Sequence, residues 1–235
     1  MSAGDSPARS ALLQLASHVP MWFRYRLMDL RGRGVYEGIP NQYKCIFIHV
    51  PKAAGSSVAL TLFGQPSRHV PYFEYERANP WKFRRYFKFA FVRNPWDRLV
   101  STYFFLRKGG MNEPDRRWSV EHLTEFPDFD SFVRGWVEEG NVWSWVHFRP
   151  QHYFICDERL ELKMDFVGRM ENMEVDYAYV ATRLGCKRTL QVVNKGAHRD
   201  YREYYSPETR EIVGHVYAVD IRLFDYRFEA QHDIV

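Results

Sequence analysis

Two short apolar runs interrupt an otherwise mixed pattern of hydrophobic and polar positions, and each is followed by a helical pattern. The first run, residues 44–49 (KCIFIH), is nearly continuous in apolar side chains, which is typical of a strand buried in a parallel sheet. A turn containing Pro51 and Gly55 follows, and residues 56–63 then predict a helix that ends at Gly64. This order predicts a strand–loop–helix unit.

The second run, residues 86–92 (YFKFAFV), is rich in aromatic side chains and predicts another strand. Asn94 is a favourable helix N-cap and Pro95 suits the first helical position, so a helix is predicted from there to about residues 107–110. The chain therefore repeats the strand–loop–helix pattern.

Further elements continue this alternation. The later segments predict a strand at 165–168 and helices at 128–138, 172–184 and 206–219. Strands that alternate with helices indicate a parallel sheet, here of about four or five strands flanked by helices. We expect a single α/β domain over residues 41–235, preceded by a peripheral segment over residues 1–40.

Composition agrees with a folded domain and narrows the class of ligand. The 235 residues are 46% hydrophobic and 26% charged, which is ordinary for a globular protein. The formal net charge of +4 is small and dispersed, so no nucleic-acid partner is indicated, although a small anionic ligand is compatible with it. The three cysteines, Cys45, Cys156 and Cys186, are widely spaced and predict neither a disulfide framework nor a CxxC metal site.

The N-terminal region lacks the pattern of a membrane or export signal. No stretch of the sequence approaches the ~18 uninterrupted apolar residues of a transmembrane helix. Asp5, Pro20 and Arg24 make the first residues a poor secretory signal. Residues 11–30 could form an amphipathic helix that contacts a membrane or a partner, or a helix that packs on its own domain. A cytoplasmic protein is the simplest expectation.

The first loop has residue types that suit an anion. It consists of Pro51, Lys52, Ala53, Ala54, Gly55, Ser56 and Ser57. Small residues that lead into a helix N-terminus present free backbone N–H groups and the positive end of the helix dipole. In the phosphate loop of ATPases the lysine follows the glycine, whereas Lys52 precedes Gly55, so that motif and its magnesium site are not predicted. A plain strand–turn–helix corner with a surface lysine would show the same pattern.

The second segment, residues 93–101, begins with Arg93 at the end of a strand, which is the edge of an open α/β sheet where ligands bind. Ser101 lies two turns into the following helix. Arginine offers a planar fork to a phosphate and serine offers a hydroxyl, so the pair predicts another anion site. Asp97 and Arg98 are open to a structural interpretation, because an acidic side chain in the first turn stabilises a helix.

Together the first loop and the second segment resemble those of sulfotransferases that use 3′-phosphoadenosine-5′-phosphosulfate (PAPS), in particular the carbohydrate sulfotransferase branch and its bacterial relatives. The first loop is similar to the family's binding loop for the 5′-phosphosulfate, except that Ala53 stands where threonine is usual. The second segment is similar to the segment that binds the 3′-phosphate, and residues 165–171 (DFVGRME) are similar to a further family strand. The likeness covers residues 44–228 and implies a P-loop kinase-like sulfotransferase fold.

The resemblance implies a reaction as well: the sulfuryl group moves from PAPS to an acceptor hydroxyl by in-line displacement. Lys52 would neutralise charge on the bridging oxygen, and no metal is implied. In this branch a histidine between the two donor motifs commonly accepts the hydroxyl proton, and His69 is the histidine in that position. His152 is a second choice, and a purely structural hydrogen bond of His69 is the alternative.

The resemblance also directs attention to residues around the acceptor and the donor. Trp143 and Trp145, with His152, belong to an aromatic segment that suits a carbohydrate or glycolipid acceptor, although core packing explains such a segment equally well. Lys195 and Arg199 could close over the 3′-phosphate of the donor.

Two other functions fit parts of the pattern. An ATP-dependent small-molecule kinase shares the architecture, but the chain lacks a Gly-Lys-Ser/Thr sequence and a carboxylate cluster for magnesium. A protein that binds a glycan or nucleotide without catalysis would keep Arg93 and Ser101 and would have no functional base.

Overall fold

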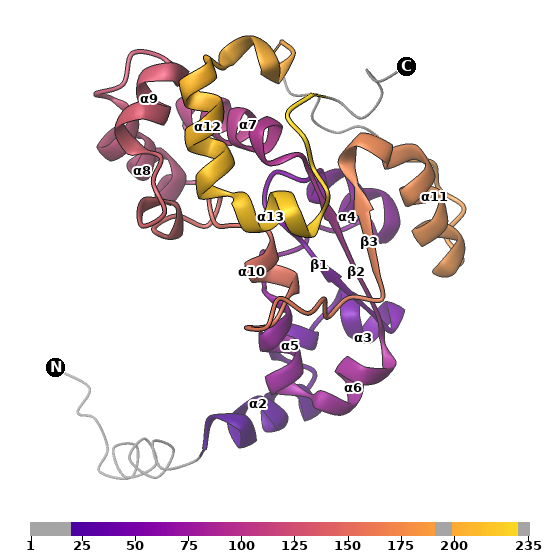
Figure 1. Ribbon diagram of the computed structural model, residues 1–235. Helices are drawn as coiled ribbons and strands as arrows, with labels where there is room; N and C mark the ends of the chain where they lie inside the picture. Colours follow the sequence, from indigo (N-terminus) through magenta and orange to yellow (C-terminus); the bar gives the residue numbers. More distant parts are fainter. Residues whose placement is uncertain (1–19, 191–198, 230–235) are drawn as a thin grey trace, which may run out of the picture.

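The computed structural model describes residues 20–190 and 199–229, except for the side chains of residues 21–23. The sheet lies at the centre, and a group of helices extends to one side of it while the N-terminal helices lie at its other end (Figure 1). In chain order, the elements are α2 (Met21–Leu30), η1 (Gly34–Tyr36), α3 (Ile39–Tyr43), β1 (Cys45–Ile48), α4 (Gly55–Phe63), α5 (Tyr72–Ala78), α6 (Pro80–Arg85), β2 (Phe87–Val92), α7 (Pro95–Arg107), α8 (Glu113–Leu123), α9 (Phe129–Trp136), η2 (Asn141–Trp143), α10 (His152–Ile155), β3 (Phe166–Arg169), η3 (Met170–Asn172), α11 (Met173–Arg183), η4 (Tyr201–Tyr204), α12 (Pro207–Val216) and α13 (Ala218–Leu223).

The sheet is parallel, with the strand order β1-β2-β3, and this confirms the α/β class. Within residues 20–190 and 199–229 it has three strands, fewer than the about four or five that the alternation of elements predicts. The chain between β2 and β3 forms helices instead, because its apolar positions recur at helical spacing. In α9, for example, Phe129, Phe132, Val133 and Trp136 are buried along one face.

Helices cover both faces of the sheet, so the strands are apolar on both sides. Phe47 and Phe89 pack on one face with residues of α4 and α11. Ile46, Ala90 and Val92 pack on the other face with residues of α5, α6 and α10. Successive side chains of a strand point to opposite faces, which is why a nearly continuous apolar run in the sequence marks a strand covered on both sides.

A second core holds the lateral group of helices, α7, α8, α9 and α12, together (Figure 1). Its centre is aromatic: Trp118, Phe132, Trp136 and Phe148 are buried against one another. The ring centroids of Trp136 and Phe148 lie 4.7 Å apart. Trp118 and Trp136, two of the tryptophans in the middle of the sequence, therefore help to hold this helical group together.

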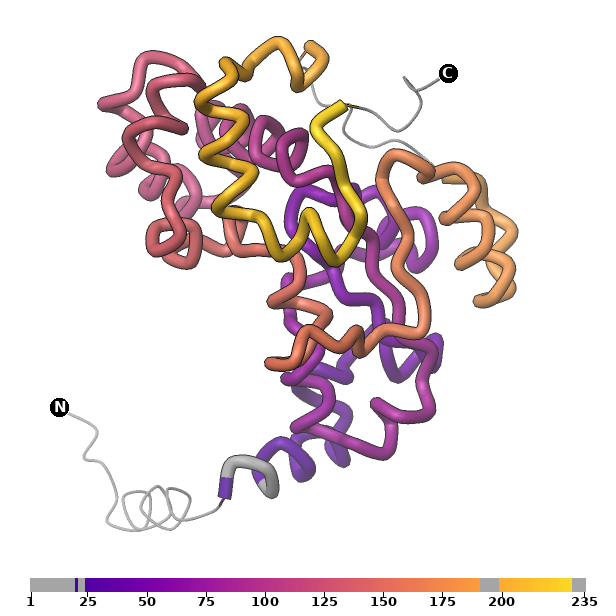
Figure 2. The backbone as a smooth tube through the Cα atoms, viewed as in Figure 1, coloured from indigo at the N-terminus to yellow at the C-terminus, as the bar shows by residue number. Residues whose placement is uncertain are grey.

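The end of the described chain returns to the sheet. The helix expected over 206–219 is divided into α12 and α13 at Tyr217, whose buried hydroxyl donates to the carbonyl of Phe148 at 2.7 Å. After α13 the chain runs back beside β3 (Figure 2). There the guanidinium of Arg169 donates to the carbonyl of Phe224 at 2.6 Å, which ties this return to the end of β3.

The N-terminal helices pack against α5 and α6. Asp29 of α2 is buried and accepts hydrogen bonds from Asn79 and Lys82, both at 2.6 Å. Tyr36 is fully buried, and its hydroxyl donates to the carbonyl of Tyr75. None of the described helices is long and apolar enough to cross a membrane, and the described residues give no support to the membrane contact considered for 11–30. The division of the chain into a peripheral segment over residues 1–40 and a domain over residues 41–235 stays a prediction.

Candidate active site

The first loop connects β1 to α4 in a tight turn. Lys52 (φ 65°) and Ala54 (φ 59°) take left-handed backbone conformations, and α4 begins at Gly55. A side chain at Gly55 is excluded, because a Cβ atom there would lie 2.0 Å from Cδ2 of His49. The backbone N–H groups of the first turn of α4, with half-buried Ser56, form the positive end of this helix. The turn thus has the backbone of an anion site.

Lys52 extends from this loop towards α7. Its Nζ lies 3.9 Å from the ring centre of Phe105, so the ammonium contacts an aromatic face. Burial and, to a smaller extent, the charge of Arg93 lower the pKa of Lys52 to about 8, although the carboxylate of Asp115 acts in the opposite direction. Lys52 therefore remains mostly protonated at neutral pH and loses its charge as the pH rises through about 8.

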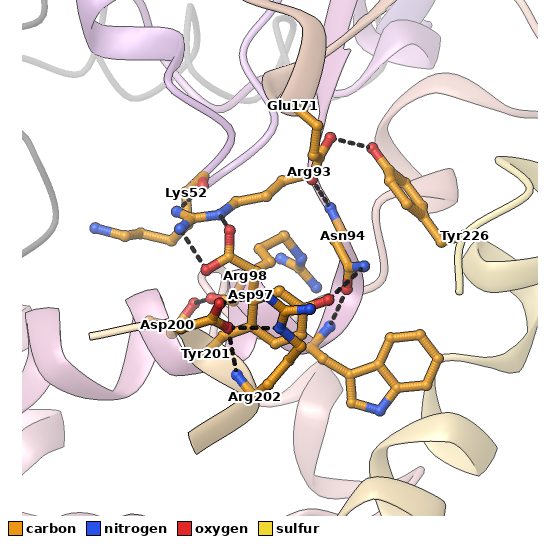
Figure 3. A network of polar contacts seen from close by, with 12 residues as sticks. Lys52, Arg93, Asn94, Asp97, Arg98, Glu171, Asp200, Tyr201, Arg202 and Tyr226 are labelled. Carbon is orange, nitrogen blue, oxygen red and sulfur yellow. Dashed lines mark hydrogen bonds and ion pairs between the residues drawn. The ribbon is translucent and has the colours of Figure 1, made fainter. Parts of the chain in front are cut away.

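Arg93 joins the first loop to the second segment (Figure 3). Its guanidinium donates to both carboxylate oxygens of Asp97 at 2.7 Å and to the backbone carbonyl of Lys52 at 3.2 Å. The residue is buried, with 6% of its surface exposed. Asp97 therefore orients the fork of Arg93, and a phosphate bound by Arg93 would share the guanidinium with Asp97. Ser101 is half-buried on α7, further along the same helix.

Glu171 fixes the ends of β2 and β3 next to this pair. One carboxylate oxygen accepts the backbone N–H of Asn94 at 2.6 Å, and the other accepts the hydroxyl of Tyr226 at 2.9 Å (Figure 3). Burial raises the pKa of Glu171 above its usual value. Glu171 belongs to residues 165–171 (DFVGRME), which are similar in sequence to a family strand. Through its bond to Asn94, this segment holds the start of the second segment in place.

Arg98 has a structural position. Only 2% of its surface is exposed, and its guanidinium donates to the carbonyls of His147, Phe148 and Arg149. It also lies over the ring of Tyr217. Arg98 therefore anchors the segment that carries His147 to α7.

Three histidines gather at the first loop. Nδ1 of His69 lies 2.8 Å from the carbonyl oxygen of His49, so this nitrogen carries the proton and Nε2 of the neutral ring is the acceptor. The ring centroid of His69 lies 4.2 Å from that of His49 and 5.7 Å from that of His147. Burial lowers the pKa of His49 to about 3, and it also lowers the pKa of His69. His69 is thus a neutral proton acceptor near Lys52.

His152, the second choice for a base, is engaged elsewhere. Its Nδ1 lies 2.6 Å from Oδ1 of Asp220, a fully buried carboxylate of α13 that also accepts the backbone N–H groups of Gln151 and His152. Gln151 in turn bonds both backbone groups of Arg93, which links α13 to the end of β2.

The two tryptophans proposed for the acceptor differ in environment. Trp143 is 42% exposed and packs edge-on against Tyr153, with ring centroids 5.5 Å apart. Trp145 is half-buried and stacks on Trp118 of the helical core. Trp143 is therefore the better placed of the two to meet a ligand from solvent.

The residues expected to cover the donor are only partly described. Lys195 lies outside the described residues. Arg199 is highly exposed, with its guanidinium 3.3 Å from Glu203 and over the ring of Tyr204. Among residues 20–190 and 199–229 the structure has no group of three or more histidine, cysteine or acidic side chains that could hold a metal ion.

The sequence analysis did not identify Phe105 and Asp115 as site residues, although both lie close to Lys52 in the structure. Phe105 belongs to an ordinary helical pattern of α7, and Asp115 follows Pro114 in the first turn of α8, where acidic residues commonly stabilise a helix. Neither residue lies in a recognisable motif, so nothing in the neighbouring sequence marks it as part of a site.

Comparison with known proteins identifies the family of the chain. The profile of the sulfotransferase family matches residues 39–227. Carbohydrate sulfotransferase 14 of Danio rerio is 27% identical over 154 residues, which cover 60% of this chain and 39% of that protein. Carbohydrate sulfotransferase 14 of Homo sapiens is 30% identical over 108 residues, which cover 41% of this chain and 28% of that protein.

An uncharacterized protein of Archaeoglobus fulgidus is 29% identical over 122 residues, which cover 52% of this chain and 87% of that protein. No solved structure gives a significant match. The chain spans less than half of the length of the carbohydrate sulfotransferases that it matches. Because the matched region, residues 39–227, includes the first loop, the second segment and most of the described fold, the chain belongs to the sulfotransferase family.

Proposed function

We propose that the protein transfers the sulfuryl group of PAPS to a hydroxyl of a carbohydrate or glycoconjugate. The observation that carries this proposal is the meeting of two anion-binding segments: the guanidinium of Arg93 donates to the carbonyl of Lys52, in the loop that leads into α4. Membership of the sulfotransferase family supports the sulfuryl transfer. The names of the matched carbohydrate sulfotransferases support the class of acceptor.

The residues present fit such a donor. Backbone N–H groups of Gly55, Ser56 and Ser57, at the start of α4, would bind the 5′-phosphosulfate, while Arg93 and Ser101 would bind the 3′-phosphate. The ring of His49 lies so close to Gly55 that a larger residue there would displace it and disturb the turn. Arg199 and Lys195 remain candidates for covering the 3′-phosphate.

Chemistry at this site would need one cation and one base. As the bond between sulfur and the bridging oxygen breaks, negative charge grows on that oxygen, and the ammonium of Lys52 offsets it. The acceptor oxygen bonds to sulfur while its proton moves to Nε2 of His69, which is held in the accepting tautomer by the carbonyl of His49. Exposed Trp143 offers an aromatic face to a sugar ring.

Donor selectivity is the first test of this proposal. We expect 3′-phosphoadenosine 5′-phosphate, the spent donor, to raise the melting temperature, while ATP with magnesium raises it much less. A ligand that binds only the folded state stabilises it by mass action. In the proposed site one set of groups, at residues 55–57, binds the 5′ anion, and Arg93 with Ser101 binds the 3′ phosphate. Thermal unfolding with each nucleotide measures this, and stronger stabilisation by ATP–magnesium would favour the kinase. Incubation with radiolabelled PAPS across glycans and glycolipids then identifies the acceptor.

Arg93→Ala is expected to weaken donor binding about 30- to 150-fold, because a charge-assisted hydrogen bond contributes about 2–3 kcal/mol. Calorimetric titration with 3′-phosphoadenosine 5′-phosphate measures the affinity. Arg116→Ala is the matched control, since Arg116 is an exposed residue of α8 that pairs with Glu113. Equal affinities of Arg93→Ala and the parent would contradict the assignment of the second segment to the donor.

A further inference from the structure

Asp115 is a buried carboxylate in a rigid setting. Only 2% of its surface is exposed, and its Oδ2 accepts the backbone N–H of Met111 at 3.1 Å. Its own backbone N–H donates to the side chain of Asn112, the N-cap of α8. A Cβ atom at Gly110 would lie 2.2 Å from Cβ of Asp115, so the preceding turn closes tightly over it. The carboxylate is therefore fixed by its surroundings.

The other oxygen of this carboxylate meets His147. Nε2 of His147 lies 3.1 Å from Oδ1 of Asp115, and the two side chains are 9% and 2% exposed. The backbone of His147 is held independently, because its carbonyl accepts from Arg98 at 3.2 Å. Nδ1 of His147 is buried and has no hydrogen-bond partner among the described residues. The ring therefore donates from Nε2 to Asp115, and its position is fixed from both sides.

This pair lies directly against the proposed catalytic residues. The ring of His147 is perpendicular to that of His69, with centroids 5.7 Å apart. Its centroid also lies 5.1 Å from that of Phe105, in a T-shaped contact, and Nζ of Lys52 lies 3.9 Å from the centre of the same Phe105 ring. A chain of contacts thus connects Asp115 to both the proposed base and the proposed cation.

Two carboxylates of the described chain lie near the proposed catalytic residues, and one of them, Asp97, is already bound to the guanidinium of Arg93. The described charged or titratable groups that act on Lys52 and His69 come from four places: Arg93 at the end of β2, His49 at the end of β1, His147 before α10 and Asp115 on α8. Of these groups, the carboxylate of Asp115 is the one that carries negative charge. It opposes the fall in the pKa of Lys52 and of His69 that burial causes.

We propose that Asp115 is a positioning residue of this site: its buried carboxylate holds His147 beside His69 and supplies the negative charge that keeps Lys52 protonated. The inference rests on the function proposed above. During transfer the electron pair of the broken S–O bond goes to the phosphate oxygen, next to Lys52, and the proton of the acceptor hydroxyl goes to His69. The carboxylate of Asp115 offsets the positive charge that His69 gains.

The pH dependence of Lys52 tests this without any substrate. In the parent, acetylation of Lys52 by acetic anhydride, followed by mass spectrometry, is expected to have its midpoint near pH 8. In Asp115→Asn the midpoint is expected to fall by about one pH unit, because a nearby opposite charge is lost. The rate of sulfate transfer by Asp115→Asn, relative to the parent, should then be roughly fivefold lower at pH 8 than at pH 6.

Two further variants separate charge from packing. In His147→Gln the amide can still donate to Asp115 and the carboxylate remains, so the midpoint of Lys52 should stay at the parental value. In the double variant Asp115→Leu/His147→Phe an apolar pair of similar size replaces the buried polar pair, a kind of exchange that proteins often tolerate. Its midpoint should fall as in Asp115→Asn, and it provides the test if Asp115→Asn does not fold.

An unchanged midpoint in either folded variant that lacks the carboxylate would overturn the inference. An equal fall in His147→Gln would also overturn it, because packing would then be the cause. If the midpoints shift as expected but the parent transfers no sulfate from PAPS, the proposed function fails while the electrostatic role of Asp115 stands.

Discussion

Replacement of His69 by alanine is expected to lower turnover by about 10²–10⁴-fold while donor affinity stays near the parental value. The reason is geometric: Nδ1 of His69 is bound to the carbonyl of His49, so Nε2 has the lone pair that can accept a proton, and the charge of Lys52 is near enough to act on this ring. Single-turnover transfer and calorimetric titration with 3′-phosphoadenosine 5′-phosphate measure the two quantities separately.

The pH profile gives His69 a second signature. Only the neutral imidazole accepts a proton, and burial lowers the pKa of His69 below its ordinary value of 6.5. The parental rate should therefore fall as the pH drops through that lowered pKa, and this acidic limb should disappear in His69→Ala. His215→Ala is the control, because the side chain of His215 is highly exposed. A His69→Ala variant with more than about a tenth of parental turnover would assign the base to another group, and one that also loses donor binding would make His69 structural.

Lys52→Ala is expected to lower turnover by about 10²–10³-fold, which is the usual cost of removing one group that stabilises charge in a transition state. Its effect on donor affinity should be smaller, because the charge that Lys52 offsets grows only as the S–O bond breaks. In the parent, activity should be lost as the pH rises through about 8, since the ammonium of Lys52 then loses its proton.

Lys108→Ala is the matched control for this variant, because Lys108 is an exposed lysine directly after α7. Parental turnover in Lys52→Ala would remove Lys52 from the reaction. A loss of affinity as large as the loss of turnover would instead show that Lys52 binds the ground state and the transition state equally.

The local pattern of the sequence was sufficient for the strands and for the starts of the central helices. The apolar runs at 44–49 and 86–92 contain β1 and β2, and Asn94 with Pro95 begins α7 as expected. These features depend on neighbouring residues, whose spacing and capping hydrogen bonds can be recognised without knowing the rest of the fold. The first loop could be recognised for the same reason, because the turn and the helix that are proposed to bind an anion are contiguous in the sequence.

Other parts of the site could not be recognised in this way. For the part of the chain that the structure describes, the prediction of about four or five strands was too high, because the chain between β2 and β3 builds a helical group with its own aromatic core. That group brings Asp115 and Phe105 to the first loop, although neither residue lies in a motif. The pairing of Arg93 with Asp97 likewise changes what the guanidinium can offer to a phosphate.

The sequence alone thus predicted the parallel α/β architecture and the resemblance to the sulfotransferase family, and it singled out the two segments that are proposed to bind the donor. The electrostatic state of the site depends on tertiary structure, because Asp115 and His147 are 32 residues apart in the chain and meet only when the helical group packs against the first loop. Burial then converts ordinary side chains into perturbed ones: Lys52 and His69 take their shifted pKa values from desolvation and from charges brought near by the fold. A residue pattern records which side chains are present, whereas their protonation is set by neighbours that are distant in the chain.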